Sequence, residues 1–536
     1  MSQPPNYFRI FFPVLLMLAL ALGYFFGVQQ KSPIFLQRAD SSPSGLVKID
    51  RILEEIDHKY VDSVDREELL EIAIQSMLEK LDPHTVYIPP QDVEFANERI
   101  QGGFEGVGVR FLIIDDTLFV TNVVPNGPSY FAGLKDGDRI LAVDTINIAG
   151  VGLTNEKVFD YLRGEKGTSA KLKIFRPNNG TNIYEVVRNR VPIESVDAAF
   201  MLNKEVGYLK LSTFAVTTEA EFVQASMKLL KQGMKKMIFD LRGNSGGVLG
   251  AAIAISDHFL PKGKLIVYTE GKSQPRRDDY STSQKALLED VELIILIDNN
   301  SASASEIVAG AIQDNDRGLI YGRRSFGKGL VQEPIDLSDG SELRLTVSRY
   351  YTPTGRSIQK PYGKGVNYAH DIRERYDAGE FYQLDSAMLD TLPKYKTPKG
   401  KTVYGGGGIF PDVFIPVDTS GTSNGLSALF YEGMFNEFCF RYLDKNRARL
   451  SKYKNVQEFA KNFQVSDQLI NELLNYSEKK GVRISKSDVE KSKERIKRRI
   501  KAGIANYLWE GGSIYYILIE EDVEVKKAME GFNLKI

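Results

Sequence analysis

Three serines of this 536-residue chain, Ser301, Ser303 and Ser305, lie where a strand, a turn and a helix are predicted to meet. The apolar run Leu293 to Ile297 is short and rich in β-branched residues, which predicts a buried strand. A polar turn follows it, and small and apolar residues over Ile307 to Ile312 then predict a helix. Free backbone N–H groups at a helix N-terminus stabilise negative charge. This arrangement is one way to place a nucleophilic serine beside an oxyanion site.

A serine hydroxyl is a weak nucleophile at neutral pH and needs a neighbouring base. The chain has four histidines, and none lies in an obvious serine–histidine–aspartate context: His58, His84, His258 and His370. Lys328, which lies closer to these serines in the sequence, is the alternative base. Its flanking glycines let another segment of backbone approach closely. A lysine acts as a general base when burial lowers its pKa towards neutrality. Gln332, four residues later, is expected to hold the neutral amine in position.

These residues resemble those of the C-terminal processing, or tail-specific, serine proteases. In that family a serine followed by Ala-Ser-Glu is the nucleophile, and a lysine 25 residues later is its base, a spacing that selects Ser303 and Lys328 here. The resemblance also implies Gln332 as a supporting residue. It implies the same for Glu306, three residues after the nucleophile, and for Ser325, where relatives often have threonine. The other two serines are then assigned to the start of the helix.

A second motif, Asp240 to Gly247, ends another predicted strand and reads Asp-Leu-Arg-Gly-Asn-Ser-Gly-Gly. It resembles the Asp-Leu-Arg-x-Asn-x-Gly-Gly motif of the same family, whose glycine backbone contributes an oxyanion donor. The resemblance implies that the backbone N–H of Ala304 and that of either Gly246 or Gly247 bind the oxyanion. A phosphate-binding loop is not indicated, because no Gly-Lys-Ser/Thr sequence follows.

From Val206 onward, predicted strands alternate with predicted helices, which indicates layered α/β packing. The family resemblance implies a ClpP/crotonase-like α/β core over residues 193–418. The segment Tyr362 to Lys399 is polar and rich in tyrosine, and we expect it to run over the surface. Leu81 to Tyr87 also resembles a family segment, and His84 within it is interpreted as a turn residue after Pro83.

Residues 98–192 are predicted to form a β-rich module inserted into the core. Four short motifs in order resemble a PDZ domain: Gly106-Val107-Gly108, Ala132-Gly133-Leu134, Asp136 to Ile140, and Leu162-Arg163-Gly164. Such a domain binds a peptide carboxylate with the N–H groups of a glycine-rich loop and pairs the peptide with a strand edge. The expected loop is Gly106, Val107, Gly108 and Val109, beside an apolar pocket. Because similar proteases couple this module to the active site, Arg163 is expected to contact the rest of the enzyme.

Residues 1–30 contain an uncharged apolar run, Ile10 to Val28, between Arg9 and Lys31. Its length can span a bilayer, and the preceding basic residue predicts a cytoplasmic N-terminus. A cleaved signal peptide is the alternative, but bulky aromatic residues at Tyr24 to Phe26 occupy the place of a small-residue cleavage site. We therefore predict an anchor in the inner membrane, with the catalytic part extracytoplasmic, in the periplasm.

Helical spacing predicts helical regions at residues 46–97 and 421–536. The net charge of −1 and the pI of about 6.5 give no indication of nucleic-acid binding. A single cysteine, Cys439, excludes internal disulfides and cysteine-cluster metal sites and is expected to be buried. The basic cluster Lys491 to Lys501 could bind anionic lipid, although a solvated helix face is favoured. This C-terminal region is expected to serve packing or oligomerisation.

The prediction is a membrane-anchored serine endopeptidase with a Ser303–Lys328 dyad and no metal or organic cofactor. Its expected partners are polypeptide substrates, which it binds and cleaves near their C-termini. The sequence leaves open whether the chain also forms a homo-oligomer or binds an adaptor protein. A non-catalytic PDZ scaffold would explain the inserted module, but not the set of Ser303, Lys328 and Gln332. An acyl-handling enzyme of crotonase type could share the core, but it would have no use for a peptide-binding module.

Overall fold

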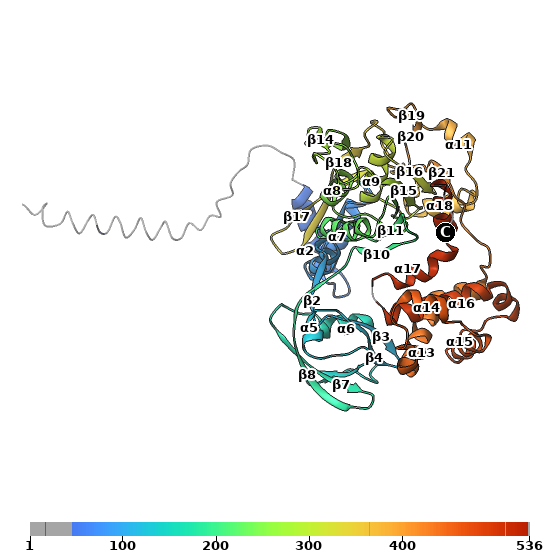
Figure 1. Cartoon of the computed structure of the whole chain (residues 1–536). Coiled ribbons are helices and arrows are strands. Elements are labelled where there is room, and N and C mark those ends of the chain that lie inside the picture. The colour runs from blue at the N-terminus through green and yellow to red at the C-terminus, as the bar shows by residue number, and fades with distance from the viewer. Residues whose placement is uncertain (1–16, 18–44, 364, 510, 534–536) are drawn as a thin grey trace, which may run out of the picture. The chain divides into compact units, whose positions relative to one another are not determined.

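The computed structural model of the chain describes residue 17 and residues 45–363, 365–509 and 511–533 (Figure 1). The predicted anchor, Ile10 to Val28, lies outside the described residues except for Met17. Within these residues, no helix has both the length and the apolar character needed to cross a membrane. The chain divides into two compact units, Met1–Ala73 and Ile74–Ile536.

The first unit contains α2 (Gly45–Lys59) and the start of α3 (Arg66–Leu78), as the apolar spacing predicts. The side chain of Asp65 accepts hydrogen bonds from the N–H groups of Glu67 and Glu68 and so satisfies the first turn of α3. Arg66 reaches back to Asp50 of α2, with 2.9 Å between Nη2 and Oδ1. These contacts account for two separate helices joined by a short polar turn.

The second unit is built on a six-stranded sheet with the order β10-β11-β12-β15-β16-β21. Its strands are β10 (Val196–Met201), β11 (Val206–Leu211), β12 (Lys236–Asp240), β15 (Glu292–Ile297), β16 (Leu319–Gly322) and β21 (Val413–Phe414). Only β10 runs antiparallel to its neighbour. Parallel neighbours need crossover connections, and these contain α7 (Thr218–Lys231), α8 (Leu249–Asp257) and α9 (Ala304–Asp314). Because β12 and β15 are adjacent and parallel, the loops at their carboxyl ends meet at one edge.

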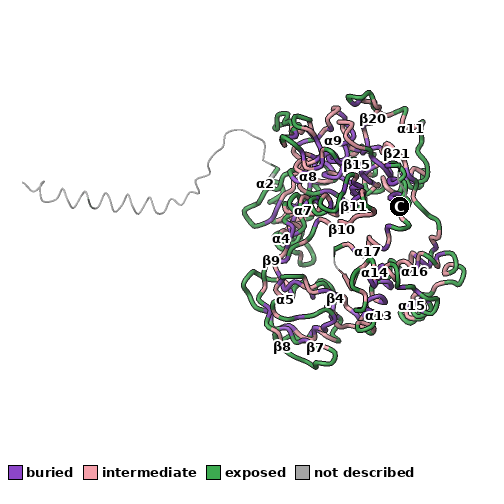
Figure 2. The backbone as a smooth tube through the Cα atoms, in the orientation of Figure 1, coloured by how far each residue is buried: buried purple, intermediate pink, exposed green. Residues whose placement is uncertain are grey.

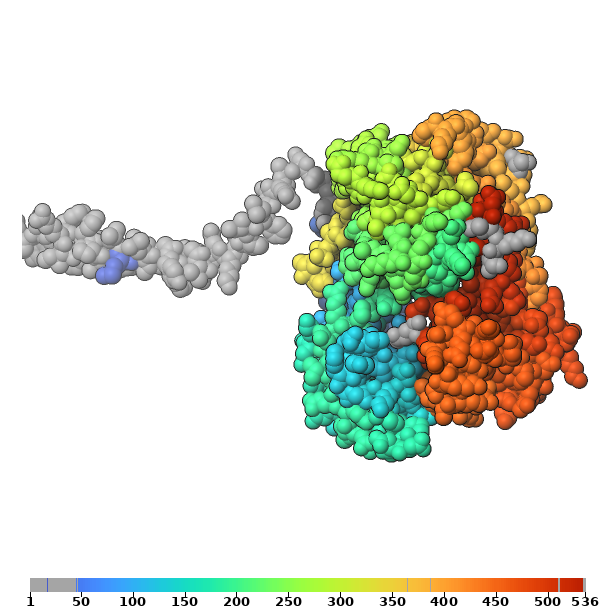
Figure 3. All heavy atoms as spheres, in the orientation of Figure 1, coloured from blue at the N-terminus to red at the C-terminus, as the bar shows by residue number. Residues whose placement is uncertain are grey.

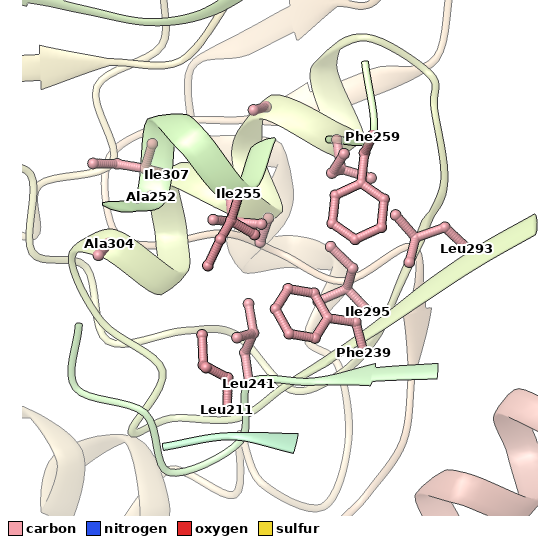
Figure 4. Close-up of a cluster of buried hydrophobic side chains, with 14 of the residues drawn as sticks. Leu211, Phe239, Leu241, Ala252, Ile255, Phe259, Leu293, Ile295, Ala304 and Ile307 are labelled. Carbon is pink, nitrogen blue, oxygen red and sulfur yellow. The ribbon is translucent and has the colours of Figure 1, made fainter. Parts of the chain in front are cut away.

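Both faces of this sheet are covered, which explains why its central strands are apolar throughout. Phe239 and Ile295 point to the face covered by α8 and α9, where Figure 4 shows the buried cluster that also includes Ala304. Ile238 and Ile294 alternate to the opposite face and pack on α18 (Val523–Gly531). Figure 2 shows β11, β15 and α9 among the buried parts of the chain.

A second, antiparallel sheet carries the lysine segment. It has the order β1-β18-β13-β14, and β17 also pairs with β18. The strands are β1 (Val86–Ile88), β13 (Leu265–Glu270), β14 (Arg277–Tyr280), β17 (Leu330–Asp336) and β18 (Glu342–Tyr351). Since both β1 and β17 pair with β18, the segment that contains Asp82 and His84 is brought beside the segment that contains Lys328.

The inserted module is a β-rich unit with its own core. A sheet of order β3-β4-β5-β7-β8 is formed by β3 (Val109–Ile114), β4 (Thr117–Val123), β5 (Arg139–Val143), β7 (Ser169–Arg176) and β8 (Gly180–Val187). β2 (Gly103–Gly106) pairs with β9 (Asn189–Pro192), and α6 (Asn155–Leu162) packs on the core. β3 is an edge strand of the larger sheet, so one of its sides has no strand partner within the module.

The C-terminal region is helical, as predicted, and is coloured orange to red in Figure 3. Its helices are α12 (Asn424–Tyr431), α13 (Met434–Leu450), α14 (Val456–Asn462), α15 (Asp467–Lys479), α16 (Lys486–Leu508), α17 (Ser513–Leu518) and α18. All of them except α18 contribute to a separate apolar cluster. Cys439 is fully buried in it, and burial raises the pKa of its thiol, so it is a packing residue.

Candidate active site

Ser303 occupies a constrained turn between β15 and α9. It is the N-cap of α9, with φ of 52° and ψ of −113°, a conformation that costs a non-glycine residue about 1–3 kcal/mol. Hydrogen bonds on both sides hold it: the Ser303 N–H donates to Glu306 Oε2 at 2.8 Å, and the Tyr350 hydroxyl donates to the Ser303 carbonyl oxygen at 3.2 Å. The strain therefore persists because neighbouring groups fix the peptide units of Ser303.

Glu306 joins the serine segment to the lysine segment. Its Oε2 accepts from the N–H of Ser303 at 2.8 Å and from the N–H of Lys328 at 2.9 Å. Its Oε1 accepts from Ser325 Oγ at 2.5 Å and from the N–H of Gly327 at 2.7 Å. The two backbone nitrogens of Ser303 and Lys328 thus lie within two hydrogen-bond lengths of each other. Burial raises the pKa of Glu306 to about 7, although these hydrogen bonds favour the ionised form.

Lys328 is half-buried beside this carboxylate. Burial lowers the pKa of its amine, an effect that the charges of Glu306 and Asp82 oppose and the charge of Arg344 reinforces. The Tyr350 hydroxyl shares its single proton between the carbonyl oxygens of Ser303 and Lys328. In the described part of the chain, Lys328 Nζ and Ser303 Oγ share no hydrogen bond. Such bonds between a nucleophile and its base commonly shorten only when substrate is bound.

The glycine motif after β12 packs directly on the serine turn. Asn244, which is fully buried, accepts from the N–H of Ala302 at 3.0 Å and from Ser305 Oγ at 2.9 Å through its carbonyl oxygen. A Cβ atom on Gly246 would lie 2.8 Å from Ser303 Cβ and 2.9 Å from the Ala304 nitrogen, so only glycine allows this approach. Asn244 therefore fixes the distance between the two loops.

The same asparagine distinguishes the two candidate glycines. Asn244 Oδ1 accepts from the N–H of Gly246 at 2.9 Å, so that donor is occupied. The N–H groups of Gly247 and Ala304 have no acceptor within the residues that the structure describes. Gly247 has φ of 145°, and a Cβ atom there would lie 2.0 Å from the Phe214 carbonyl oxygen. The donors left free are thus that of Ala304, next to Ser303, and that of Gly247, next to Gly246 in the chain.

Gln332 contacts a different group from the one the sequence predicts. Its Nε2 donates to Thr346 Oγ1 at 3.1 Å, and no hydrogen bond joins it to Lys328 among the described residues. Thr346 Oγ1 in turn donates to Asp82 Oδ1 at 3.1 Å. Burial raises the pKa of Asp82, but hydrogen bonds from Thr85 and neighbouring N–H groups outweigh it and lower the pKa below its usual value. Gln332 therefore belongs to a network that ends on an ionised Asp82.

His84 and Tyr368 are two residues of the site that sequence reasoning missed. His84 Nε2 is hydrogen-bonded to the Tyr368 hydroxyl at 2.8 Å, and the two rings meet edge to face. Burial and the charge of Lys328 lower the pKa of His84 to about 4, so its ring is neutral at pH 7. Tyr368 lies in the segment predicted to run over the surface, and Lys360 Nζ lies 4.0 Å from its ring centroid. The resemblance of Leu81 to Tyr87 to a family segment was the one available signal.

In the inserted module, the predicted carboxylate loop connects β2 to β3. Gly108 has φ of 77°, which lets the loop turn, while the buried Val107 anchors it to Ser129, whose N–H and hydroxyl both donate to the Val107 carbonyl oxygen. A cavity of about 480 Å³ adjoins the loop and includes Phe104 and Val109 in its lining. Val107 itself is part of the module core.

Arg163, just after α6, contacts α4 (Pro90–Gln101). Its Nη2 lies 2.9 Å from Glu98 Oε2. Its guanidinium lies 4.5 Å from the ring centroid of Phe159, 4.9 Å from Phe95 and 5.5 Å from Phe104. Arg163 therefore connects the end of the module helix with α4, which begins before the module and ends inside it.

The described residues contain no group of three or more histidine, cysteine, aspartate or glutamate side chains suited to hold a metal ion. The arrangement instead offers a constrained serine, a lysine with a lowered pKa and two free N–H donors. These are the components of nucleophilic acyl transfer.

Comparisons with known proteins agree with this chemistry. The family model for peptidase family S41 matches residues 205–370, and that for the PDZ domain matches residues 119–176. Residues 28–91 match the model "Activating protease CtpB N-terminal domain", and residues 426–511 match a family of unknown function, DUF8443. The predicted fold class, an α/β core with an inserted PDZ domain and helical terminal regions, is confirmed.

Relatives with curated names extend the match over most of the chain. Carboxy-terminal processing protease CtpB of Bacillus subtilis (strain 168) is 34% identical over 364 residues, which cover 67% of this chain and 74% of the relative. The carboxy-terminal-processing protease of Bartonella bacilliformis is 36% identical over 333 residues, covering 61% and 74%. A solved photosystem II D1 C-terminal processing protease is 33% identical with a TM-score of 0.33, covering 58% of this chain and 83% of that one.

Proposed function

The chain belongs to peptidase family S41, as a serine-type C-terminal processing protease, and on this premise we propose that Ser303 and Lys328 form its catalytic dyad. The observation that carries the proposal is the carboxylate of Glu306, one oxygen of which binds the N–H groups of both residues. A lysine whose pKa is lowered by burial can supply the neutral amine that a base requires.

In the proposed reaction, Ser303 Oγ attacks the scissile carbonyl carbon while Lys328 Nζ accepts the hydroxyl proton. The N–H groups of Ala304 and Gly247 bind the oxyanion that forms, since both donors are free. Lys328 then donates the proton to the leaving amine, which leaves an acyl group on Ser303. Lys328 Nζ, neutral again, then deprotonates a water molecule that attacks the acyl carbon, and the proton passes to Ser303 Oγ as the acyl bond breaks, which restores the dyad.

We assign supporting roles to the residues around the dyad. Glu306 and Ser325 hold the lysine loop in register with the serine turn. Gln332 acts through Thr346 rather than directly on Lys328. The PDZ module captures the substrate C-terminus at Gly106 to Val109, with β3 as the pairing edge and Arg163 as its contact with α4.

The dyad is tested by incubating the chain and its variants with an unfolded protein and identifying new termini. Arginine cannot be deprotonated in a protein, so Lys328→Arg should be as inactive as Lys328→Ala while keeping its fold by circular dichroism. Replacing His58, His258 or His370, which lie outside the site, should leave turnover measurable. The assignment of the Ser303–Lys328 dyad would be wrong if Lys328→Ala cleaved the unfolded protein at a near-normal rate.

Capture of the C-terminus is tested with a peptide substrate and its C-terminal amide. A free carboxylate makes charge-assisted hydrogen bonds that an amide cannot. We expect amidation to lower kcat/KM at least about tenfold, the effect of losing roughly 1.4 kcal/mol of interaction. Equal cleavage of both peptides would rule out carboxylate capture and leave the dyad untouched.

We further propose that the substrates are extracytoplasmic and that Ile10 to Val28 anchors the chain in the inner membrane, supported by its length and by Arg9 before it. We propose the domain divisions 46–97, 98–192, 193–418 and 421–536 as well. A chain that stays with membranes after a salt wash and begins at Met1 is the expected result. A soluble chain that begins beyond residue 20 would contradict the anchor.

A further inference from the structure

The C-terminal helical region has a groove that the peptidase chemistry does not use. The groove lies among α13, α14 and α15 and has a volume of about 780 Å³. α13 is kinked at Asn446, where φ is −120° and ψ is 16°, and the Asn446 side chain donates to the Tyr442 carbonyl oxygen at 2.8 Å. Both residues line the groove, so the hollow coincides with the kink.

The lining of the groove is cationic, although the whole chain has a net charge of −1. Its one carboxylate, Glu472, faces five cations: Arg441, Lys445, Arg449, Lys452 and Lys479. Of these, only Arg441 forms an ion pair with another described residue. Cations without an internal partner concentrate anionic ligands at such a surface.

The remaining lining residues fit a polypeptide. Five aromatic rings are present: Phe438, Tyr442, Tyr453, Phe463 and Tyr476. Arg449 lies 5.7 Å from the centroid of Tyr442, and Lys452 lies 5.0 Å from that of Tyr453, so the rings hold cationic groups at the lining. Five amides complete the lining: Asn446, Asn462, Gln464, Gln468 and Asn475. An amide both donates and accepts, as each peptide unit requires.

We propose that this groove is an exosite for an acidic segment of a polypeptide substrate. Carboxylates of the segment would pair with Lys445, Arg449, Lys452 and Lys479, and the amides would bind its backbone. The choice of a polypeptide rests on the peptidase function, whereas the choice of an anion rests on the groove alone. A second attachment point raises the local concentration of a bound chain near the module and the dyad.

Arg441 connects the groove to the PDZ module. It lines the groove and forms an ion pair with Asp115, in the turn between β3 and β4, while Lys480 Nζ binds the same carboxylate at 2.9 Å. An anion in the groove competes with Asp115 for Arg441. By linkage, Asp115→Asn should therefore strengthen binding of an acidic ligand.

The test measures binding of fluorescent hexaglutamate to the full chain carrying Ser303→Ala, which separates binding from cleavage. We expect Lys445→Gln with Arg449→Gln to weaken binding about tenfold, which corresponds to about 1.4 kcal/mol for the loss of two exposed ion pairs. Lys452→Gln with Lys479→Gln should act in the same direction. The matched control is Lys486→Gln with Lys491→Gln, two exposed α16 lysines that form no ion pair with described residues and lie outside the groove.

The outcomes separate the proposal from its competitors. Weaker binding by the groove pairs only, together with tighter binding by Asp115→Asn, supports the exosite. Equal affinity of the groove double variants and the α16 control double variant for hexaglutamate overturns the proposal, because the peptide would then be attracted by positive charge anywhere on the surface. Binding of hyaluronate, an acidic polysaccharide, without binding of hexaglutamate also overturns it. Because Ser303→Ala is present throughout, failure here would leave the dyad proposal untouched.

Discussion

Replacing Glu306 with glutamine tests whether one carboxylate keeps the dyad in register. All four of its neighbours are donors: the N–H groups of Ser303, Gly327 and Lys328, and the Ser325 hydroxyl. Glutamine keeps one acceptor oxygen and adds an NH₂ group. If its oxygen stays on Ser303 and Lys328, the NH₂ group faces Gly327, whose N–H then has no partner. We expect the lysine loop to shift, and kcat to fall about 10–100-fold, as small misplacements do.

Although Glu306→Gln should lose activity, its stability relative to the unsubstituted enzyme should rise with pH. Burial raises the pKa of Glu306 to about 7 from a reference of 4.5, so the folded state binds its proton more tightly than the unfolded state. The stability due to this proton is fully present below pH 4.5 and is lost as the pH rises through 7. At 1.36 kcal/mol per pKa unit, ionisation in the folded enzyme costs about 3 kcal/mol by pH 8.5, and about 2 kcal/mol of this arises above pH 5.5.

Glutamine cannot ionise, so it escapes this cost but leaves a buried donor unpaired, which costs about 1–3 kcal/mol at any pH. The unfolding free energy of Glu306→Gln, relative to the unsubstituted enzyme, should therefore increase by about 2 kcal/mol from pH 5.5 to pH 8.5. The assays are denaturant unfolding at both pH values and peptide hydrolysis at pH 8.5. Glu270→Gln, at an exposed position without an ion pair, is the matched control. The reasoning is refuted if Glu306→Gln keeps kcat within about twofold, or if its relative stability does not change with pH.

Two further substitutions test other contacts of the site. Asp82→Asn removes a negative charge that raises the pKa of Lys328, so the pKa of Lys328 should fall further. The acidic limb of the kcat–pH profile should then move to lower pH. An unmoved limb would show that Asp82 does not act on Lys328. Arg163→Ala leaves the buried Glu98 without its partner and should lower the unfolding free energy by about 1–3 kcal/mol. Glu98→Gln in the same chain should recover part of this loss. Strictly additive effects of Arg163→Ala and Glu98→Gln would mean that the pair contributes nothing.

Local signals account for the parts of the site that the sequence predicts. The apolar run of β15 and the small residues of α9 predict a strand–turn–helix unit with Ser303 in its turn, whereas the pairing of Ser303 with Lys328 is implied by the family resemblance. The same holds for residues 421–536, which helical spacing predicts to be helical and which contain α12 to α18. In each case neighbours in the chain are also neighbours in the structure, so residue order carries the information.

The contacts of Gln332 could not be predicted, because they depend on strand register. β17 and β18 shift register between Val331 and Gln332. Such a bulge changes the direction of the following side chain, and here it directs Gln332 to Thr346 rather than to Lys328. The contact of His84 with Tyr368 joins residues 284 positions apart and is equally hidden from local patterns. The choice between Gly246 and Gly247 depends on the direction of the Asn244 side chain, which residue spacing does not specify.

The arginine of the glycine motif shows how the C-terminal region takes part in the fold. Arg242 pairs with Asp240 at the end of β12 and with Asp522 and Glu524 at the start of α18, with closest N–O distances of 2.6, 2.8 and 3.1 Å. These pairs fix α18 over the face of the sheet that bears Ile238 and Ile294. Without that cover, the face opposite the crossover helices would expose a row of apolar side chains to water. The same loop that supplies Gly247 to the proposed oxyanion site therefore also holds the last described helix against the core.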